Sequence, residues 1–161
     1  GYCIAFPPAN PPLPATILGL EPGTEVAQPA IGPGGVKDRV TTKVGDLNKD
    51  PLGEGYDLVF LSAIYHMNSE EQNRDLTHRA MQALAPGGMI AVQDFILNAD
   101  KSGPYTGALF SLNMLVATPE GASYSIAEYS EWLTEAGFVD IRHLQLPGPA
   151  GLIVGRRPES A

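Results

Sequence analysis

Short apolar runs alternate along this chain with longer segments whose apolar residues recur at helical spacing. The runs at 15–20, 40–44, 56–64 and 89–95 are bounded by turn residues and predict strands. The run at 56–64, YDLVFLSAI, is apolar on both faces after its first two residues, which is typical of a strand covered on both sides. We therefore expect it to be the most central of these strands.

The longer segments predict helices, and two of them open with a capping box. The predicted helices are a weak one within 25–38, one from Ser69 and Gln72 to the Pro-Gly-Gly turn at 86–88, an apolar one over 105–116, and an amphipathic one from Ser125 and Glu128 to Gly137. Strands that alternate with helices in this way predict an α/β fold with a mostly parallel sheet.

The end of the chain departs from this alternation. Two strand patterns, 139–146 and 151–157, follow each other with only a Pro-Gly-Pro loop at 147–149 between them. Strands joined by so short a connection pair antiparallel most easily. The predicted sheet is therefore mostly parallel, with an antiparallel C-terminal hairpin.

Composition restricts the class of protein. A chain of 161 residues with 43% hydrophobic content fits one domain. No run reaches the roughly 18 uncharged apolar residues of a membrane span, and the start lacks a secretory signal pattern, so we expect a cytoplasmic protein without membrane contact. Cys3 is the only cysteine, which excludes an internal disulfide and a thiolate metal cluster.

The net charge further limits which classes of ligand the protein is expected to bind. Ten basic residues against eighteen acidic ones give a net charge of -8, which opposes binding to a nucleic-acid backbone and suits a neutral or cationic small ligand. The GPGG stretch at 32–35 lacks the spacing of a phosphate-binding loop and predicts an ordinary loop. His66, His78 and His143 are scattered, so no metal site is predicted.

Polar residues gather where the predicted strands end, which is where ligands bind in α/β sheets. They are Asp46, Ser62, His66, Gln93 and Asp94. An imidazole and a carboxylate at the ends of adjacent strands can face one another, and the carboxylate would then hold the ring in one tautomer and raise its basicity. The alternatives are that His66 is a helix-entry histidine without chemistry and that Asp94 caps the following turn.

The order of these segments resembles a known family. VGDLNKDPLGEGYDLVFLSAIYHMNSEEQNRDLTHRAMQALAPGGMIAVQDF, followed by ALFSLNMLV and YSIAEYSEWLTEAGF, is similar to the catalytic domain of S-adenosylmethionine-dependent small-molecule O-methyltransferases of the hydroxyindole, caffeic-acid and anthracycline type. The resemblance implies a Rossmann-like class I methyltransferase sheet, with residues 1–161 forming part of that domain. It also implies that the family's first strand and helical N-terminal dimerisation domain lie outside the chain, so a homodimer is expected only for a full-length form.

The resemblance assigns roles to particular residues. His66 falls on the general base that takes a proton from a small-molecule phenol or enol, and Asp94 on the acid that supports it. The S-adenosylmethionine positions are Gly1 at the end of the glycine-rich loop, Asp46 and Leu47 against the adenine, and Ser62. The positions on the helix that lines the substrate pocket are Phe110, Asn113 and Met114, although residues of this type at helical spacing are more often core.

Some positions depart from the family pattern. Gly19 stands where the ribose-binding acid is expected, Pro7-Pro8 interrupts the first helix, and HMN at 66–68 replaces the usual histidine, aspartate and tryptophan. A non-catalytic binding module with the same fold is therefore an alternative. A nucleotide-binding dehydrogenase is a weaker alternative, because G-x-G-x-x-G is missing.

Overall fold

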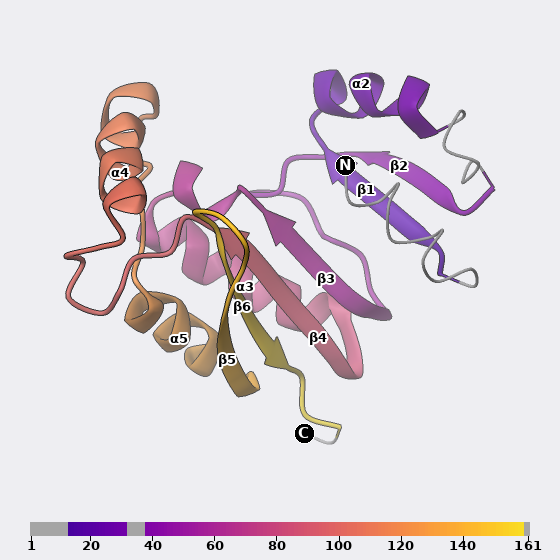
Figure 1. Cartoon of the computed structure of the whole chain (residues 1–161). Coiled ribbons are helices and arrows are strands. Elements are labelled where there is room, and N and C mark those ends of the chain that lie inside the picture. The colour runs from indigo at the N-terminus through magenta and orange to yellow at the C-terminus, as the bar shows by residue number, and fades with distance from the viewer. Residues whose placement is uncertain (1–12, 32–37, 160–161) are drawn as a thin grey trace. The chain divides into compact units, whose positions relative to one another are not determined.

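The computed structural model describes residues 13–31 and 38–159, which form two compact units, Gly1–Leu52 and Gly53–Ala161 (Figure 1). Three features named above, Gly1, Pro7-Pro8 and the GPGG loop, lie outside the described residues. Each unit contains a sheet of its own, so the sequence-predicted strands are divided between two sheets.

The first unit contains two parallel strands, β1 (Ala15–Gly19) and β2 (Val40–Val44), with helix α2 (Glu21–Ile31) between them along the chain. Ile31 and Val40 are its buried hydrophobic pair, with Ala15 and Ile17 packed against them. The helix begins four residues before the predicted start at residue 25. Pro22 explains this, because proline suits the first turn of a helix.

The second unit contains the remaining elements and a four-stranded sheet of order β3-β4-β6-β5. Its elements are β3 (Tyr56–Ser62), the short 3-10 helix η1 (Tyr65–Met67), α3 (Glu70–Ala83), β4 (Leu84–Asp94), α4 (Tyr105–Ala117), α5 (Ile126–Glu135), β5 (Val139–Gln145) and β6 (Gly151–Arg156). Strands β3 and β4 are parallel, and β6 pairs antiparallel with both β4 and β5. The predicted α/β class and the antiparallel C-terminal hairpin are confirmed.

The prediction that the 56–64 run is the most central strand is wrong for this sheet. Strand β3 is at one edge, whereas β4 has a hydrogen-bonded neighbour on each side. Leu58 in β3 is 43% exposed, whereas Ile90 and Val92 in β4 are fully buried. An apolar run indicates that the two faces of a strand are covered, but it does not indicate how many strands lie beside that strand.

The predicted turn at 86–88 and strand start at Met89 are also corrected. Helix α3 ends at Ala83, and β4 begins at once at Leu84 and runs through the Pro-Gly-Gly segment. The pairing of β3 with β4 shifts in register between Tyr56 and Leu58, opposite this segment. Gly88 has no room for a Cβ, because the Ala85 and Tyr56 carbonyl oxygens lie about 3 Å away from where it would be. Close backbone approach, not chain reversal, therefore explains the second glycine.

Both predicted capping boxes are present. Ser69 accepts from the backbone N–H of Gln72 and Ser125 from that of Glu128, and each partner side chain bonds back to the cap. Gly137 follows α5 with φ +95°, as a helix-ending glycine should. Helices α3 and α5 contact each other and the sheet, so their apolar faces close the core of this unit.

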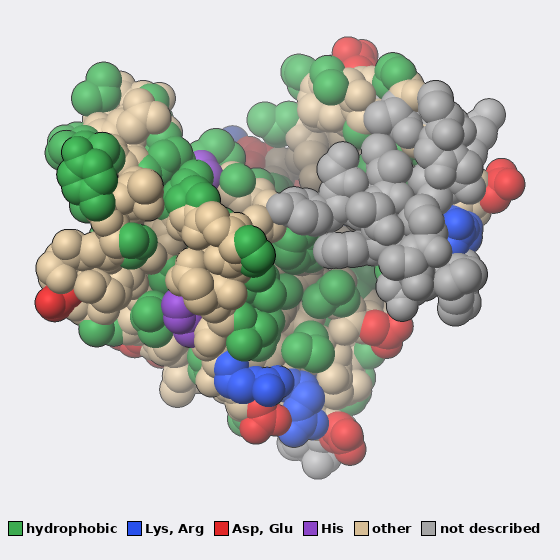
Figure 2. Space-filling view, viewed as in Figure 1, with side chains coloured by type: hydrophobic (Ala, Val, Ile, Leu, Met, Phe, Trp, Pro, Cys, Tyr) green, Lys and Arg blue, Asp and Glu red, His purple; other side chains and the backbone are tan. Residues whose placement is uncertain are grey.

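Helix α4 is different, because its main contact is with η1. Figure 2 shows hydrophobic atoms gathered on its surface. Its exposed apolar side chains are Tyr105, Leu109, Leu112, Leu115 and Val116. No helix in the described part of the chain is long and apolar enough to cross a membrane.

Candidate active site

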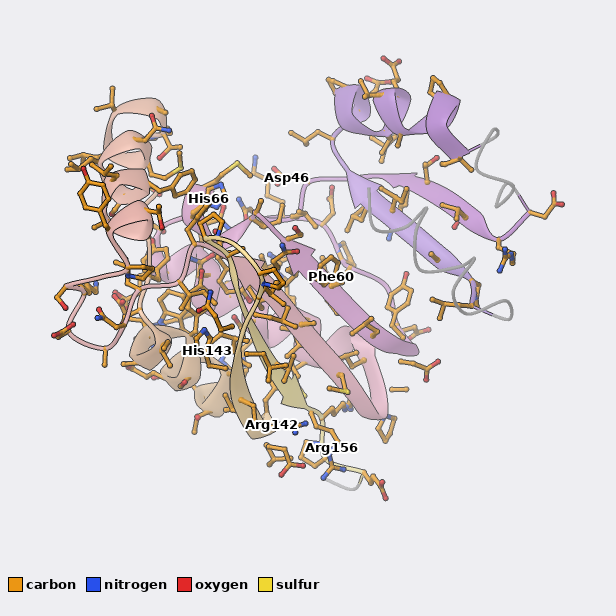
Figure 3. The ribbon with its side chains drawn as sticks, in the orientation of Figure 1. Asp46, Phe60, His66, Arg142, His143 and Arg156 are labelled. Atoms are coloured by element: carbon orange, nitrogen blue, oxygen red, sulfur yellow. The ribbon has the colours of Figure 1, made fainter. Side chains whose placement is uncertain are left out.

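His66 lies in η1, directly after the end of β3. Ala63 directly follows the strand with φ +57°, a left-handed conformation that turns the chain, and its N–H donates to the Gln93 carbonyl at 2.9 Å. The turn places His66 at the carboxyl ends of β3 and β4, beside α4 (Figure 3). Its residue surface is only 8% exposed.

Asp94, the last residue of β4, binds His66 twice. The imidazole Nδ1 lies 2.6 Å from Asp94 Oδ1, and the backbone N–H of His66 donates to Oδ2 at 3.2 Å. The backbone N–H of Phe95 also donates to Oδ1 at 2.8 Å. Asp94 therefore contacts the histidine through both of its oxygens and also accepts from the residue that follows it in the chain.

These contacts decide the tautomer of His66. Asp94 accepts two backbone N–H groups, so the carboxylate acts as an acceptor toward its neighbours. The proton between the imidazole and the carboxylate then belongs to Nδ1. Within residues 13–31 and 38–159, no group hydrogen-bonds Nε2, so its lone pair is left to accept a proton.

Tyr129 of α5 stands behind the pair. It is fully buried, hydrogen-bonds Asp94, and packs its ring against Tyr65 and Trp132, each with ring centroids 5.5 Å away. Burial and the nearby Asp94 carboxylate raise the pKa of Tyr129 well above its usual value. The hydroxyl therefore keeps its proton and faces the Asp94 carboxylate as a donor.

Aromatic rings form the other side of the His66 environment. Phe110 of α4 meets the imidazole edge to face with centroids 4.8 Å apart, and Phe95 lies 4.1 Å from Phe110. Met114 is buried, whereas Asn113 is exposed. Of the three positions assigned to the substrate helix, Phe110 packs its ring against the histidine.

Ser62, the last residue of β3, is half-buried, and its hydroxyl lies 3.4 Å from the Gln93 side-chain oxygen on the neighbouring strand. Asp46 and Leu47 belong to the first unit and directly follow β2. The Asp46 carboxylate accepts from the Asn48 N–H at 2.9 Å and lies 3.3 Å from Lys49 Nζ. These two contacts hold the 46–50 turn in one conformation.

Sequence reasoning missed two residues that hold the His66 turn. Asn73 is fully buried on α3, and Gly121 lies against the His66 carbonyl oxygen with no room for a Cβ. The burial of Asn73 could have been predicted, because Asn73 is three residues before Leu76 and so shares the apolar face of the helix. The contact of Gly121 could not have been predicted, because a loop glycine gives no indication of what it packs against.

The other histidines take no part in this site. His78 is exposed on α3, and His143 of β5 is half-buried with its ring over Gly151. Among the described residues, no group of three or more His, Cys, Asp or Glu side chains has the arrangement of a metal site.

Known proteins resemble this chain over most of its length. The O-methyltransferase domain family matches residues 8–139. The 3-hydroxy-5-methyl-1-naphthoate 3-O-methyltransferase of Streptomyces sahachiroi is 37% identical over 148 residues, which are 91% of this chain and 43% of that protein. The tetracenomycin polyketide synthesis 8-O-methyl transferase TcmO of Streptomyces glaucescens is 35% identical over 150 residues, 93% of this chain and 44% of that protein.

A solved structure shows the same fold. PigF with SAH superposes with a TM-score of 0.86 at 32% identity, covering 96% of this chain and 46% of that chain. PigF is an S-adenosyl-L-methionine-dependent methyl transferase of a Serratia strain. The chain spans less than half the length of each of these relatives. The family match over residues 8–139 and the shared fold lead to one conclusion: the chain belongs to the O-methyltransferase domain family.

Proposed function

We propose that this chain carries the base and acceptor side of an S-adenosylmethionine-dependent O-methyltransferase, which methylates a hydroxyl group of a small molecule. One observation carries the proposal: a buried imidazole is held by a carboxylate through Nδ1 and keeps Nε2 available, beside two aromatic rings. The relatives named above act on naphthoate and tetracenomycin hydroxyls, and PigF is seen with SAH, which supports the same class of reaction.

The residues assigned to the cofactor suit a polar nucleoside. Ser62 and Asp46 follow the carboxyl ends of parallel strands, which is where α/β sheets bind nucleotides. The Asp46 side chain is partly exposed and lies in a turn fixed by its own hydrogen bonds. We propose that Gly1, Asp46, Leu47 and Ser62 contact S-adenosylmethionine. When bound, it would supply the electrophilic methyl group.

The proposed chemistry of the chain is proton removal. When bound, S-adenosylmethionine would give up its methyl group to the acceptor oxygen and leave as S-adenosylhomocysteine. His66 would take the hydroxyl proton on Nε2, and Asp94 would stabilise the imidazolium. Phe95 and Phe110 would cover the ring of an aromatic acceptor and keep water from the imidazole. Positioning of the two reactants supplies much of the remaining rate.

A test replaces the base. In the protein as its gene encodes it, His66→Gln should lower kcat for methyl transfer to a phenolic acceptor by roughly 10²-fold, because it removes the proton acceptor but keeps a polar side chain of similar length. Radiolabelled methyl transfer measures the rate, and His78→Gln on the exposed face of α3 is the matched control. An unchanged rate would remove the base role.

Binding decides between this proposal and a non-catalytic module. Calorimetry with S-adenosylhomocysteine should show equal affinity for the native protein and for His66→Gln, because His66 acts on the acceptor and not on the cofactor. Absence of detectable binding to the native protein would contradict the proposed function altogether.

A further inference from the structure

The residues HMN at 66–68 contain the proposed base and end in an asparagine whose purpose the sequence does not reveal. In the structure Asn68 is 4% exposed, and its side-chain Nδ2 donates to the Oδ1 of Asn73 at 3.1 Å. Asn73 is on α3 and is fully buried. A buried pair of amides is uncommon on an apolar helix face and is kept only when both are hydrogen-bonded.

The amide of Asn73 brackets His66 from both sides along the chain. Its Nδ2 donates to the backbone carbonyl of Tyr65 at 3.0 Å, directly before His66. Its Oδ1 accepts from Asn68, two residues after His66. One side chain on a rigid helix therefore fixes both ends of the turn that contains the imidazole.

The same turn is fixed again through Tyr65. The Tyr65 hydroxyl lies 2.8 Å from the Thr77 hydroxyl, which donates to the backbone carbonyl of Asn73 at 2.6 Å. Burial raises the pKa of Tyr65 beyond its usual range, so this hydroxyl keeps its proton as a donor. Tyr65, Asn73 and Thr77 form a closed buried network between η1 and α3 in which each polar group is satisfied.

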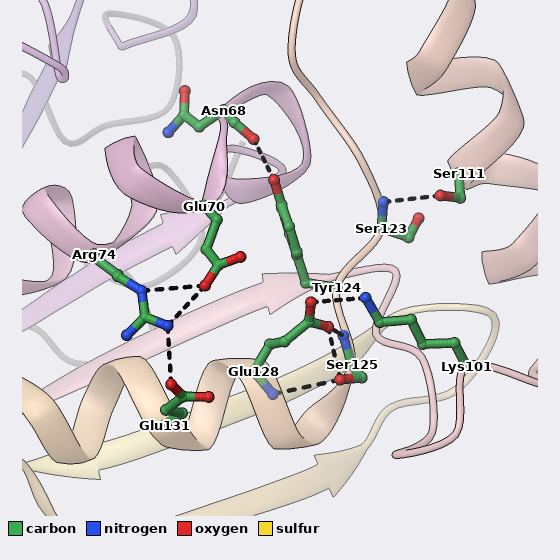
Figure 4. Close-up of polar contacts among 10 residues, drawn as sticks. All are labelled: Asn68, Glu70, Arg74, Lys101, Ser111, Ser123, Tyr124, Ser125, Glu128 and Glu131. Atoms are coloured by element: carbon green, nitrogen blue, oxygen red, sulfur yellow. Dashed lines mark hydrogen bonds and ion pairs between the residues drawn. The ribbon is translucent and has the colours of Figure 1, made fainter.

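The opposite side of the turn is held by the segment before α5. The Tyr124 hydroxyl donates to the backbone carbonyl of Asn68 at 2.6 Å (Figure 4). Gly121 lies directly against the His66 carbonyl oxygen. With these contacts on one side and Asn73 on the other, the backbone at His66 cannot shift without breaking a buried hydrogen bond or making a clash.

We propose that Asn73 is a positioning residue for His66, which fixes the η1 turn so that the imidazole meets both Asp94 and the acceptor hydroxyl. The inference rests on the proposed function, because it assigns His66 the base role. A misplacement of about 1 Å can cost roughly 10²-fold in rate, so the precision of this turn matters for proton transfer.

The first test is a double-mutant cycle in the protein as its gene encodes it. Asn73→Ala should lower kcat about tenfold to 100-fold while the KM for S-adenosylmethionine stays within about twofold. In the His66→Gln background the same substitution should lower kcat no further, because its effect passes through His66. An equal loss in both backgrounds would show a structural role alone and overturn the proposal.

A second variant guards against a protein that does not fold. Asn73→Ser keeps a hydroxyl that can bond the Ser69 carbonyl one turn earlier, but it is too short to bridge Tyr65 and Asn68. It should show the same pattern of kcat and KM as Asn73→Ala. The control is Leu133→Val, a core change on α5 packed near Gly155, which should lower stability but leave kcat of the folded protein unchanged.

A spectroscopic test does not depend on activity. In protein labelled with ¹⁵N-histidine, the Nδ1 proton of His66 should give a downfield signal, because of its 2.6 Å contact with Asp94, and His66→Gln assigns it by its loss. The signal should shift or broaden in Asn73→Ala and stay in place in Leu133→Val. An unmoved signal in Asn73→Ala would overturn the positioning role. If His66→Gln leaves the rate unchanged, the base role fails, and this signal still decides whether Asn73 holds the ring.

Discussion

At the scale of the residue, the pair His66 and Asp94 is the feature from which the chemistry follows. Asp94 is 3% exposed, and each of its oxygens accepts from the backbone or from the imidazole. A buried charge is tolerated only when it is satisfied in this way. The contact with Asp94 therefore sets the tautomer of His66, with the proton on Nδ1, before any substrate arrives.

Asp94→Asn tests this point. An asparagine that turns its NH₂ group toward Nδ1 would require the proton to move to Nε2, which could then no longer accept one. We expect kcat to fall roughly 10²-fold or more, with the affinity for S-adenosylhomocysteine unchanged. Asp100→Asn changes an exposed carboxylate that accepts from Ser102, and it should behave like the native protein. Equal rates for the two variants would contradict the role of Asp94.

At the scale of the element, the site is a 3-10 turn held between a helix and a loop. Helix α3 starts at a complete capping box on Ser69, which fixes where the turn of His66 must end. A salt bridge from Arg74 to Glu131 joins α3 to α5 near this point, and Arg74 also pairs with Glu70 within α3 (Figure 4). The position of His66 therefore depends on elements that are far apart in the sequence.

Gly121→Ala tests the loop side. A Cβ at this position would overlap the His66 carbonyl oxygen and the Thr118 hydroxyl, so the η1 turn must move. We expect the free energy of unfolding to fall by about 1–3 kcal/mol and kcat to fall with it. Urea denaturation and initial rates measure the two effects.

A matched control is Gly23→Ala in α2, where a Cβ meets nothing within 4 Å. This change should be neutral or stabilise the helix by up to about 1 kcal/mol. A native rate and native stability in Gly121→Ala would show that the loop can yield without disturbing His66.

At the scale of the whole molecule, buried tyrosines couple stability to alkaline pH. Burial is the largest cause in each case: it raises the pKa of Tyr124 to about 12, and it raises those of Tyr65 and Tyr129 further. An unfolded tyrosine ionises near pH 10. Their contribution to stability is therefore complete below pH 10 and is lost as the pH rises through the pKa values of the folded state, since only the unfolded chain then releases the protons.

We expect the free energy of unfolding to decrease steadily between pH 10 and 12. The fluorescence of Trp132, the only tryptophan and 1% exposed, follows urea denaturation at each pH. Tyr124→Phe removes one of the ionising groups, so its stability should depend less steeply on pH in this window. Parallel curves for Tyr124→Phe and the native protein would contradict the linkage.

Much of this molecule follows from local sequence pattern. The capping boxes at Ser69 and Ser125 and the C-terminal hairpin were predicted because hydrogen bonds between near neighbours and short loops determine them. The encounter of His66 with Asp94 was predictable because parallel strands end at one edge of a sheet. The edge position of β3 was not, because neighbour number is a property of the sheet.

The sequence by itself determined the α/β class, the family and the identity of the imidazole and its carboxylate. Only the tertiary structure decided that the Phe95 N–H also donates to Asp94, that Phe110 packs against the imidazole while Asn113 is exposed, and that Asn73 and Gly121 hold the turn of His66. The physical reason is that these contacts join residues of different elements. Asn73 contacts Tyr65, and Gly121 contacts His66, and a local sequence pattern does not predict how separate elements pack.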